Sequence, residues 1–279
     1  MTTVTISAAD VNKLRHQTGS GMMDCKKALT EANGDFEKAI EILRLKGAKI
    51  SASRADRETK EGVVVTKISA DGKTGIILGL SCETDFVARG EGFIAFAEQC
   101  ATLGLTNTIA NVETLKSTNL ENVTLAEAII AQIGKIGEKI DVVQYALLTG
   151  ECVVSYIHSN KKNGALIALN QASTEAILAA GKQVGMQIVS MNPVSLDKSD
   201  VSEEIVKREL DLAKEKAKQD GKPDNMLDKI ANGALEKFYK EATLLNQEFI
   251  MDGSKKVSQM LDGVSKGLTV TAFNKVTLG

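Results

Sequence analysis

Two pairs of apolar, strand-like segments recur in this chain at a constant spacing, and this repeat constrains the fold more than any other feature. The first pair covers residues 63–68 and 75–80, and the second covers residues 152–157 and 164–169. Each segment of the second pair follows its counterpart by 89 positions. Short polar turns join the segments, and helical patterns follow at residues 93–103 and 175–190. We therefore predict an α+β protein whose core consists of two similar β-hairpin–helix subdomains.

Residues 1–54 carry the signals of three short helices. Ser7 is a predicted N-cap with Asp10 at the N3 position. Gly19 and a second glycine two residues later separate the first helix from the second, because glycine tolerates the backbone conformation at helix ends. Residues 49–61 are polar and charged, which predicts a linker.

Residues 198–245 carry two apolar stripes at helical spacing, interrupted by a Gly-Lys-Pro tripeptide. The stripes are Val206, Leu210, Ala213 and Ala217, then Leu227, Ile230, Ala234 and Phe238. Because the tripeptide breaks a helix, the two halves should fold back as an antiparallel coiled-coil hairpin. Residues 268–273 predict a last strand that returns to the core. The predicted division is a helical module at 1–54, a first core subdomain at 55–145, the start of a second at 146–197, the coiled-coil insertion at 198–245 and a return segment at 246–279.

The charge balance argues against several classes of partner. With 34 Lys and Arg against 36 Asp and Glu, the net charge is −2, so the chain offers no general basic field to nucleic acid or an anionic membrane. The four cysteines are scattered and there are only two histidines, which argues against a zinc site or a disulfide framework. The N-terminus lacks the regions of a signal peptide. We expect a soluble, cytoplasmic protein with no direct nucleic-acid or membrane contact, no cofactor and no metal.

No convincing catalytic site is found in the sequence. Residues 72–74 resemble the end of a phosphate-binding loop, but the glycine required upstream falls at Lys67. Cys82 and His158 can be proposed as a nucleophile and its base. However, Cys82 ends an apolar strand, where a buried structural thiol is the more common outcome. We therefore predict that the protein is not an enzyme.

Two adjacent methionines, Met22 and Met23, open the predicted second helix. Neighbouring helical positions point about 100° apart, so one side chain can enter the core while the other meets solvent. Flexible thioethers suit an adaptable binding surface, and the alternative, which the pattern alone favours, is that both fill a small core. With Leu14 and Arg15 across the glycine break, they can form an apolar patch edged by a cation. We predict that this patch docks a partner.

The apolar strand at residues 76–80 leads into Thr84, Asp85, Phe86 and Val87. An Asp-Phe pair at a strand end can present a carboxylate and a ring to a partner. The alternative, which local pattern favours, is that Thr84 or Asp85 caps the next helix while Phe86 packs beneath it.

Both segments match motifs of one family. Thr-Gly-x-Gly-Met-Met-Asp-Cys-Lys-Lys-Ala-Leu at residues 18–29 and Cys-x-Thr-Asp-Phe-Val at residues 82–87 resemble bacterial elongation factor Ts, and the likeness covers nearly the whole chain. The resemblance implies a ubiquitin-associated-like N-terminal module, a core of two similar subdomains and an inserted coiled coil. One departure is Gln187, where the family often has His.

The resemblance also implies a function, a guanine-nucleotide exchange factor that binds elongation factor Tu with GDP and promotes GDP release. In the family the Asp-Phe element enters near the Mg²⁺ site of the GTPase, so Thr84, Asp85, Phe86 and Val87 are the residues implied to disturb the ion and the phosphates. The expected partner-binding residues are Leu14, Arg15, Met22, Met23 and His158. The arm is expected to serve self-association or an accessory contact. The alternative function is a non-catalytic adaptor that holds two partners.

Overall fold

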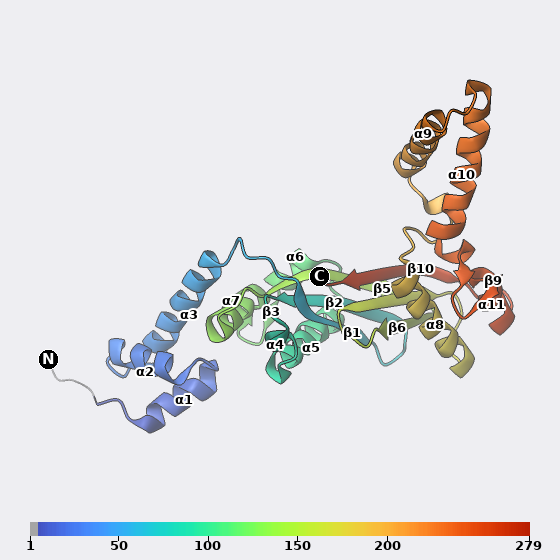
Figure 1. Cartoon of the computed structure of the whole chain (residues 1–279). Coiled ribbons are helices and arrows are strands. Elements are labelled where there is room, and N and C mark those ends of the chain that lie inside the picture. Colours follow the sequence, from blue (N-terminus) through green and yellow to red (C-terminus); the bar gives the residue numbers. More distant parts are fainter. Residues whose placement is uncertain (1–4) are drawn as a thin grey trace. The chain divides into compact units, whose positions relative to one another are not determined.

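The computed structural model describes residues 5–279, which divide into two units. Unit 1 consists of the described residues up to Val65 together with Leu78–Ala146 and Val276–Gly279, and unit 2 consists of Thr66–Ile77 and Leu147–Lys275. Helices and strands occur in both, so the α+β class is confirmed (Figure 1). Within residues 5–279, no helix has the length and apolar character needed to cross a membrane. The first four residues, on which the signal-peptide argument depends, lie outside the described residues.

Unit 1 opens with the three predicted helices, α1 (Ala8–Thr18), α2 (Met22–Glu31) and α3 (Phe36–Ser53). Ser7 and Asp10 form a reciprocal capping box, with N–O distances of 3.1 Å and 3.2 Å. Gly19 ends α1 in the left-handed conformation, with φ 65°. Leu14 and Leu29 are buried in the small core that these helices share. The linker prediction for residues 49–61 is wrong in its first part, because α3 continues to Ser53.

The third helix packs against α7 (Leu125–Ile136), which begins with a capping box of Thr124 and Glu127. The contact is close because both helices have a glycine there. A Cβ atom placed on Gly134 would lie 2.9 Å from the Cα atom of Gly47, which is shorter than real Cβ contacts allow. The two glycines therefore let the helix backbones approach each other.

Both halves of the chain build a three-stranded sheet around a hairpin. The first half contains β1 (Glu61–Ile68), β2 (Thr74–Cys82), α4 (Asp85–Ala88), α5 (Glu91–Thr106), α6 (Val112–Ser117), β3 (Asn119–Leu120), β4 (Val123–Thr124) and β5 (Asp141–Thr149). The second half contains β6 (Cys152–Ile157), β7 (Asn163–Leu169), α8 (Glu175–Met191), β8 (Glu248–Phe249), β9 (Asp252–Lys256), α11 (Val257–Val264) and β10 (Val270–Thr277). The sheet orders are β1-β2-β5 and β10-β7-β6, so the second strand of the hairpin lies in the middle of both.

In unit 2, α8 covers the sheet with Ile177, Val184 and Ile188, all buried in one apolar cluster with β6, β7 and β10. The hairpin strands pair from Cys152 with Leu169 to Ile157 with Gly164. Two repeat-equivalent side chains, Thr66 and Ser155, hydrogen-bond to each other at 3.2 Å. The short elements α6, β3, β4, β8, β9 and α11 were not among the sequence predictions.

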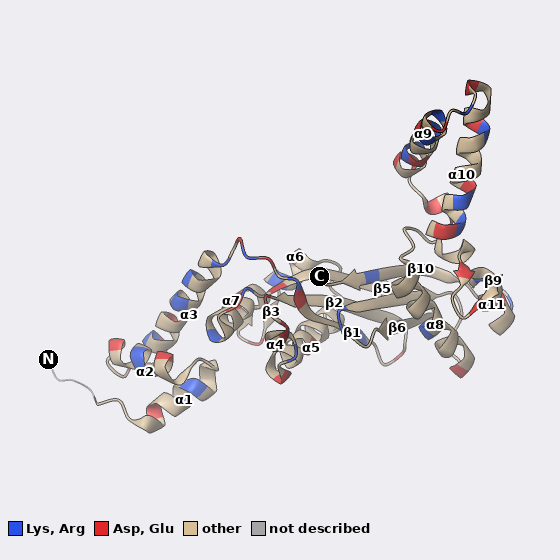
Figure 2. Cartoon of the chain, in the orientation of Figure 1, with Lys and Arg blue, Asp and Glu red and all other residues tan. Residues whose placement is uncertain are grey.

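The arm of unit 2 consists of α9 (Glu203–Gln219) and α10 (Leu227–Ala242), which pack against each other. Lys214 of α9 pairs with Asp228 near the start of α10 at 2.7 Å, and Lys198, which precedes α9, pairs with Glu236 further along α10 at 2.6 Å. The earlier residue pairs with the later one, so the helices are antiparallel. Figure 2 shows basic and acidic residues interspersed along both. The predicted stripe is wrong at Ala234, which is exposed.

Candidate functional site

The turn at residues 84–87 presents an aromatic ring to solvent. Thr84 follows the end of β2 and caps the one-turn helix α4, with its Oγ1 accepting from the amide of Val87 at 3.4 Å. The ring of Phe86 is 86% exposed, so the expectation that it packs beneath the helix is wrong, whereas the cap at Thr84 is confirmed. The ring is therefore free to contact a partner.

Asp85 lies beside this ring and is only partly exposed. Its Oδ2 lies 3.0 Å from Nη2 of Arg89, one helical turn later. A surface ion pair of this kind contributes little to stability, so Asp85 can exchange Arg89 for a group on a partner at small cost.

The turn is held by a carboxylate that the sequence analysis missed. Glu138 accepts from the amides of Glu83 and Thr84 at 3.1 Å and 3.0 Å, and from the Thr84 hydroxyl at 2.6 Å. In return, Glu83 accepts from the amide of Lys139 at 2.7 Å. These residues are 54 to 56 positions apart, and no local pattern connects them.

Glu83 also binds the end of the helical module. Nη1 of Arg54, the residue after α3, lies 2.7 Å and 2.9 Å from the two carboxylate oxygens. Burial disfavours the charged carboxylate, but the Lys139 amide and the Arg54 guanidinium outweigh it and lower the pKa of Glu83 below its ordinary value. Nζ of Lys139 donates to the carbonyl oxygens of Ala55 and Arg57 at 2.6 Å and 2.9 Å.

The predicted docking patch on the helical module is exposed in part. Met22 and Met23 are 52% and 64% exposed, which rules out the alternative that they fill the core and the expectation that only one meets solvent. Arg15 is exposed as well. Leu14 is fully buried, so it supports the patch from below and cannot form its surface. The reason is that α1 turns its Leu14 side into the core shared with α2 and α3.

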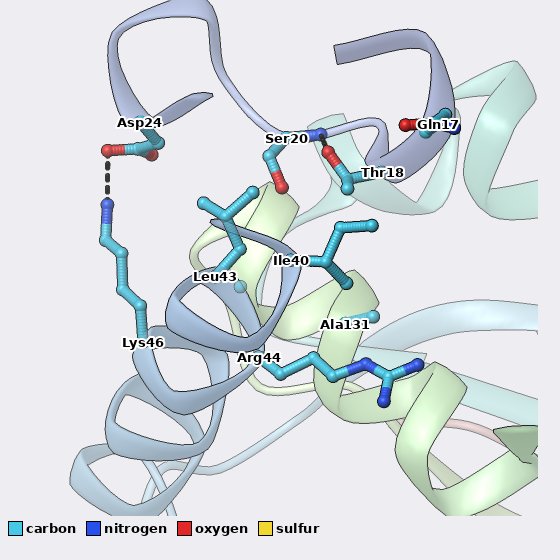
Figure 3. Close-up of a pocket in the computed structure, with 10 residues that line it drawn as sticks. Gln17, Thr18, Ser20, Asp24, Ile40, Leu43, Arg44, Lys46 and Ala131 are labelled. Atoms are coloured by element: carbon cyan, nitrogen blue, oxygen red, sulfur yellow. Dashed lines mark hydrogen bonds and ion pairs between the residues drawn. The ribbon is translucent and has the colours of Figure 1, made fainter. Parts of the chain in front are cut away.

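A small hollow lies between the α1–α2 loop, α3 and α7 (Figure 3). Thr18 lines it from the end of α1, Ser20 from the loop, and Ile40 and Leu43 from α3. An ion pair between Asp24 and Lys46 lies at its edge. Its volume of about 190 Å³ is below the usual range for ligand pockets, so it fits a side chain better than a nucleotide.

His158 belongs to unit 2, at the start of the turn after β6. Its Nδ1 lies 3.0 Å from the hydroxyl of Tyr156, and its amide donates to the carbonyl oxygen of Asn163 at 2.8 Å. The ring is exposed. Because Nδ1 is engaged by Tyr156, Nε2 is the atom that a partner would meet.

Gln187, a position where the resemblance is imperfect, is fully buried. Its side chain binds Gln247, Glu248 and Ile250, all in unit 2. The side chain therefore contributes to the stability of this unit.

The four cysteine thiols are buried, as is typical of structural cysteines. All four cysteines are buried, and burial raises the pKa of Cys100 to about 12 and also raises the pKa of Cys152. Sγ of Cys82 lies 3.2 Å from the carbonyl oxygen of Thr84. Among residues 5–279 no cluster of three or more potential metal ligands occurs.

Comparisons with known proteins agree with one another. The model of the family described as Elongation factor TS matches residues 83–279. A protein named elongation factor Ts from Cytophaga hutchinsonii is 51% identical over 275 residues, which cover 98% of this chain and 99% of that protein. The proteins of the same name from Amoebophilus asiaticus and Flavobacterium psychrophilum are 46% and 42% identical, and the alignments cover 98% and 99% of this chain and 99% of each relative.

Proposed function

The chain belongs to the elongation factor Ts family, and we propose that it is the guanine-nucleotide exchange factor that binds elongation factor Tu with GDP and releases the nucleotide. Its curated relatives carry the name of a translation elongation factor. Exchange of this kind needs no bond chemistry. The exchange factor binds the nucleotide-free GTPase more tightly than the GDP-bound form. Bound GDP therefore weakens the binding of the exchange factor, and the exchange factor weakens the binding of GDP to the same extent.

The observation that carries this proposal is the exposed ring of Phe86 on its capped turn. The ring acts as a wedge between elements of the GTPase near the bound Mg²⁺. Asp85 competes there for groups that hold the ion, after leaving its weak pair with Arg89. Thr84 and Val87 complete the turn. Displacement of Mg²⁺ removes the main charge that neutralises the diphosphate, and GDP then dissociates faster.

Two further surfaces complete the proposed contact. Arg15, Met22 and Met23 form the docking surface of the helical module, because two exposed thioethers can adapt to a partner. His158 is proposed to reach the phosphate-binding loop of the GTPase through Nε2. These contacts hold the partner, while the Phe86 turn acts on the nucleotide site.

The architecture fits the same proposal. The three N-terminal helices constitute a ubiquitin-associated-like module, and the two hairpin–helix halves constitute similar subdomains. The α9–α10 arm is proposed to be a coiled-coil insertion that serves self-association or an accessory contact. The five ranges predicted from the sequence remain the proposed domain division, and the cytoplasm is the proposed location.

The experiment is stopped-flow release of a fluorescent GDP from purified elongation factor Tu. Phe86→Ala should slow release about tenfold or more, equivalent to ~1.4 kcal/mol on the barrier. Asp85→Ala should have a smaller effect that low Mg²⁺ partly rescues. Leu178→Ala removes another exposed apolar side chain outside the proposed contacts and serves as the control.

Release at the wild-type rate with Phe86→Ala would contradict the wedge. Because the ring is exposed, its removal should leave the free energy of unfolding within about 0.5 kcal/mol of wild type. A protein that binds elongation factor Tu without accelerating release would be the adaptor instead.

A further inference from the structure

The position of Phe86 depends on groups outside its own turn. A helix of four residues is too short to be stable alone, and the exposed ring has little packing to orient it. The direction of the ring is therefore set by the backbone of the turn, and the backbone is set by whatever anchors it. The anchor in the structure is the carboxylate of Glu138.

Glu138 fixes the two residues immediately before α4. It accepts from the consecutive amides of Glu83 and Thr84, at 3.1 Å and 3.0 Å, and from the Thr84 hydroxyl at 2.6 Å. A hydroxyl can donate one bond and accept others, so Thr84 can bind Glu138 and still cap α4. Hydrogen bonds to an ionised acceptor are about twice as strong as neutral ones.

The anchor itself is fixed from both sides. Gly137 ends α7 in the left-handed conformation, with φ 82°, and its amide donates to the carbonyl oxygen of Ile133 at 2.8 Å. Glu138 follows directly. The amide of Lys139 then donates to Glu83 at 2.7 Å, so the segment after β2 and the segment after α7 hold each other through their carboxylates. Arg54 neutralises Glu83, which limits the repulsion between the two carboxylates.

We infer that Glu138 is a positioning residue for nucleotide exchange, which holds the Thr84 turn so that Phe86 enters the partner in a preorganised conformation. The inference rests on the proposed function of the turn. Without the anchor, the partner still binds through the other surfaces, but the turn has to be ordered in the complex before the ring can act. The loss should therefore fall on the maximal exchange rate and leave the half-saturating concentration nearly unchanged.

The chain offers a matched control at the other end of α7. Glu127 also accepts from a backbone amide and a threonine hydroxyl, both of Thr124, at 2.8 Å and 3.0 Å. Glu127→Ala therefore removes a comparable carboxylate from the first turn of α7 without touching the turn at residues 84–87. In stopped-flow GDP release at several factor concentrations, Glu138→Ala should lower the maximal rate about fivefold or more, and Glu127→Ala should stay within about twofold of wild type.

Two further variants separate positioning from general stability. Glu138→Gln keeps an oxygen that can accept from the two amides, so its maximal rate should lie between those of wild type and Glu138→Ala. In the Phe86→Ala background, Glu138→Ala should cause little additional loss, because the ring that it positions is already absent. If circular dichroism shows that Glu138→Ala does not fold, the same test is made with Glu138→Gln. Its effect on the maximal rate is then compared in the wild-type and Phe86→Ala backgrounds.

The outcomes distinguish the two claims. If Phe86→Ala slows release but the Glu138 variants have the wild-type maximal rate, the positioning role is wrong and the proposed function stands. An equal loss from Glu138→Ala with and without Phe86 would also overturn the positioning role, because it would show an effect independent of the ring. If Phe86→Ala itself releases GDP at the wild-type rate, the proposed function of the turn fails, and the inference fails with it.

Discussion

The amide side chain of Gln187 is fully buried in unit 2, and we predict that Gln187→Ala lowers the free energy of unfolding by about 3 kcal/mol. Its Nε2 donates to Oε1 of Gln247 at 3.1 Å and to the carbonyl oxygen of Glu248 at 3.0 Å. Its Oε1 accepts from the amide of Ile250 at 2.8 Å. Substitution by alanine removes all three hydrogen bonds and leaves two acceptors and one donor without this partner.

The magnitude follows from these three bonds. Each contributes roughly 0.5–1.5 kcal/mol net, so together they amount to roughly 1.5–4.5 kcal/mol. Gln247 is 1% exposed, so its freed oxygen does not lie at the protein surface. The space left by the amide adds to the loss, whereas a water molecule that enters this polar space would reduce it. The middle of the range is therefore the expected value.

Urea unfolding followed by far-ultraviolet circular dichroism measures this change. The chain has no tryptophan, so indole fluorescence is not an option. Hydrogen exchange adds a local test, because the amide of Ile250 loses its acceptor and should exchange faster in the variant.

Gln183→Ala is the matched control. It removes the same side chain one turn earlier in α8, at a half-buried position, and should change the free energy of unfolding by less than about 1 kcal/mol. If Gln187→Ala is no more destabilising than Gln183→Ala, the buried hydrogen bonds do not stabilise unit 2 as argued.

Four further predictions concern the proposed contacts, the arm and the effect of pH. Met22→Ala combined with Met23→Ala should weaken binding to elongation factor Tu by about 1–3 kcal/mol in calorimetry, and unchanged affinity would remove them from the interface. His158→Ala should slow GDP release in the stopped-flow assay, and a wild-type rate would exclude it from the site. Replacing residues 198–245 with a short glycine-containing turn should preserve hydrogen-exchange protection in the rest of the chain, because α9 and α10 pack on each other; lost protection there would make the arm part of the core. The pKa of Glu83 is lowered in the folded state, so the ionised carboxylate stabilises the folded protein at pH values above its unfolded-state pKa. This contribution to the free energy of unfolding is lost as the pH falls through the folded-state pKa. The loss of unfolding free energy between about pH 7 and about pH 3 should thus be smaller in Glu83→Gln than in wild type, and equal losses would count against the argument.

Helix starts were predictable because their contacts are local. Ser7 and Asp10 are three residues apart, as are Thr124 and Glu127, and both capping boxes are present in the structure. A cap of this kind forms wherever the chain turns into a helix, whatever surrounds it. The shortest elements were missed for the opposite reason. A helix such as α6, with six residues, has too few positions to show a period.

Exposure was predicted less well than secondary structure. Helical spacing places Leu14 and Met22 near the same glycine break, but one is fully buried and the other is 52% exposed. Phenylalanine is usually buried, but Phe86 is 86% exposed. Periodicity indicates which residues share a face, whereas burial depends on whether another element covers that face.

The α+β class, the repeated hairpins, the helix caps and the family motifs could all be predicted from the amino-acid sequence, because they depend on neighbouring residues or on the order of residue types. The side chains that support the turn at residues 84–87 are known only from the folded structure. Glu83 and Glu138 are 55 positions apart, and their contact exists because β2 and the end of α7 meet in unit 1. The same holds for Gln187 and Ile250, which are 63 positions apart. These hydrogen bonds form between buried or partly buried polar groups that only the completed fold brings together. No local pattern in the sequence therefore predicts them.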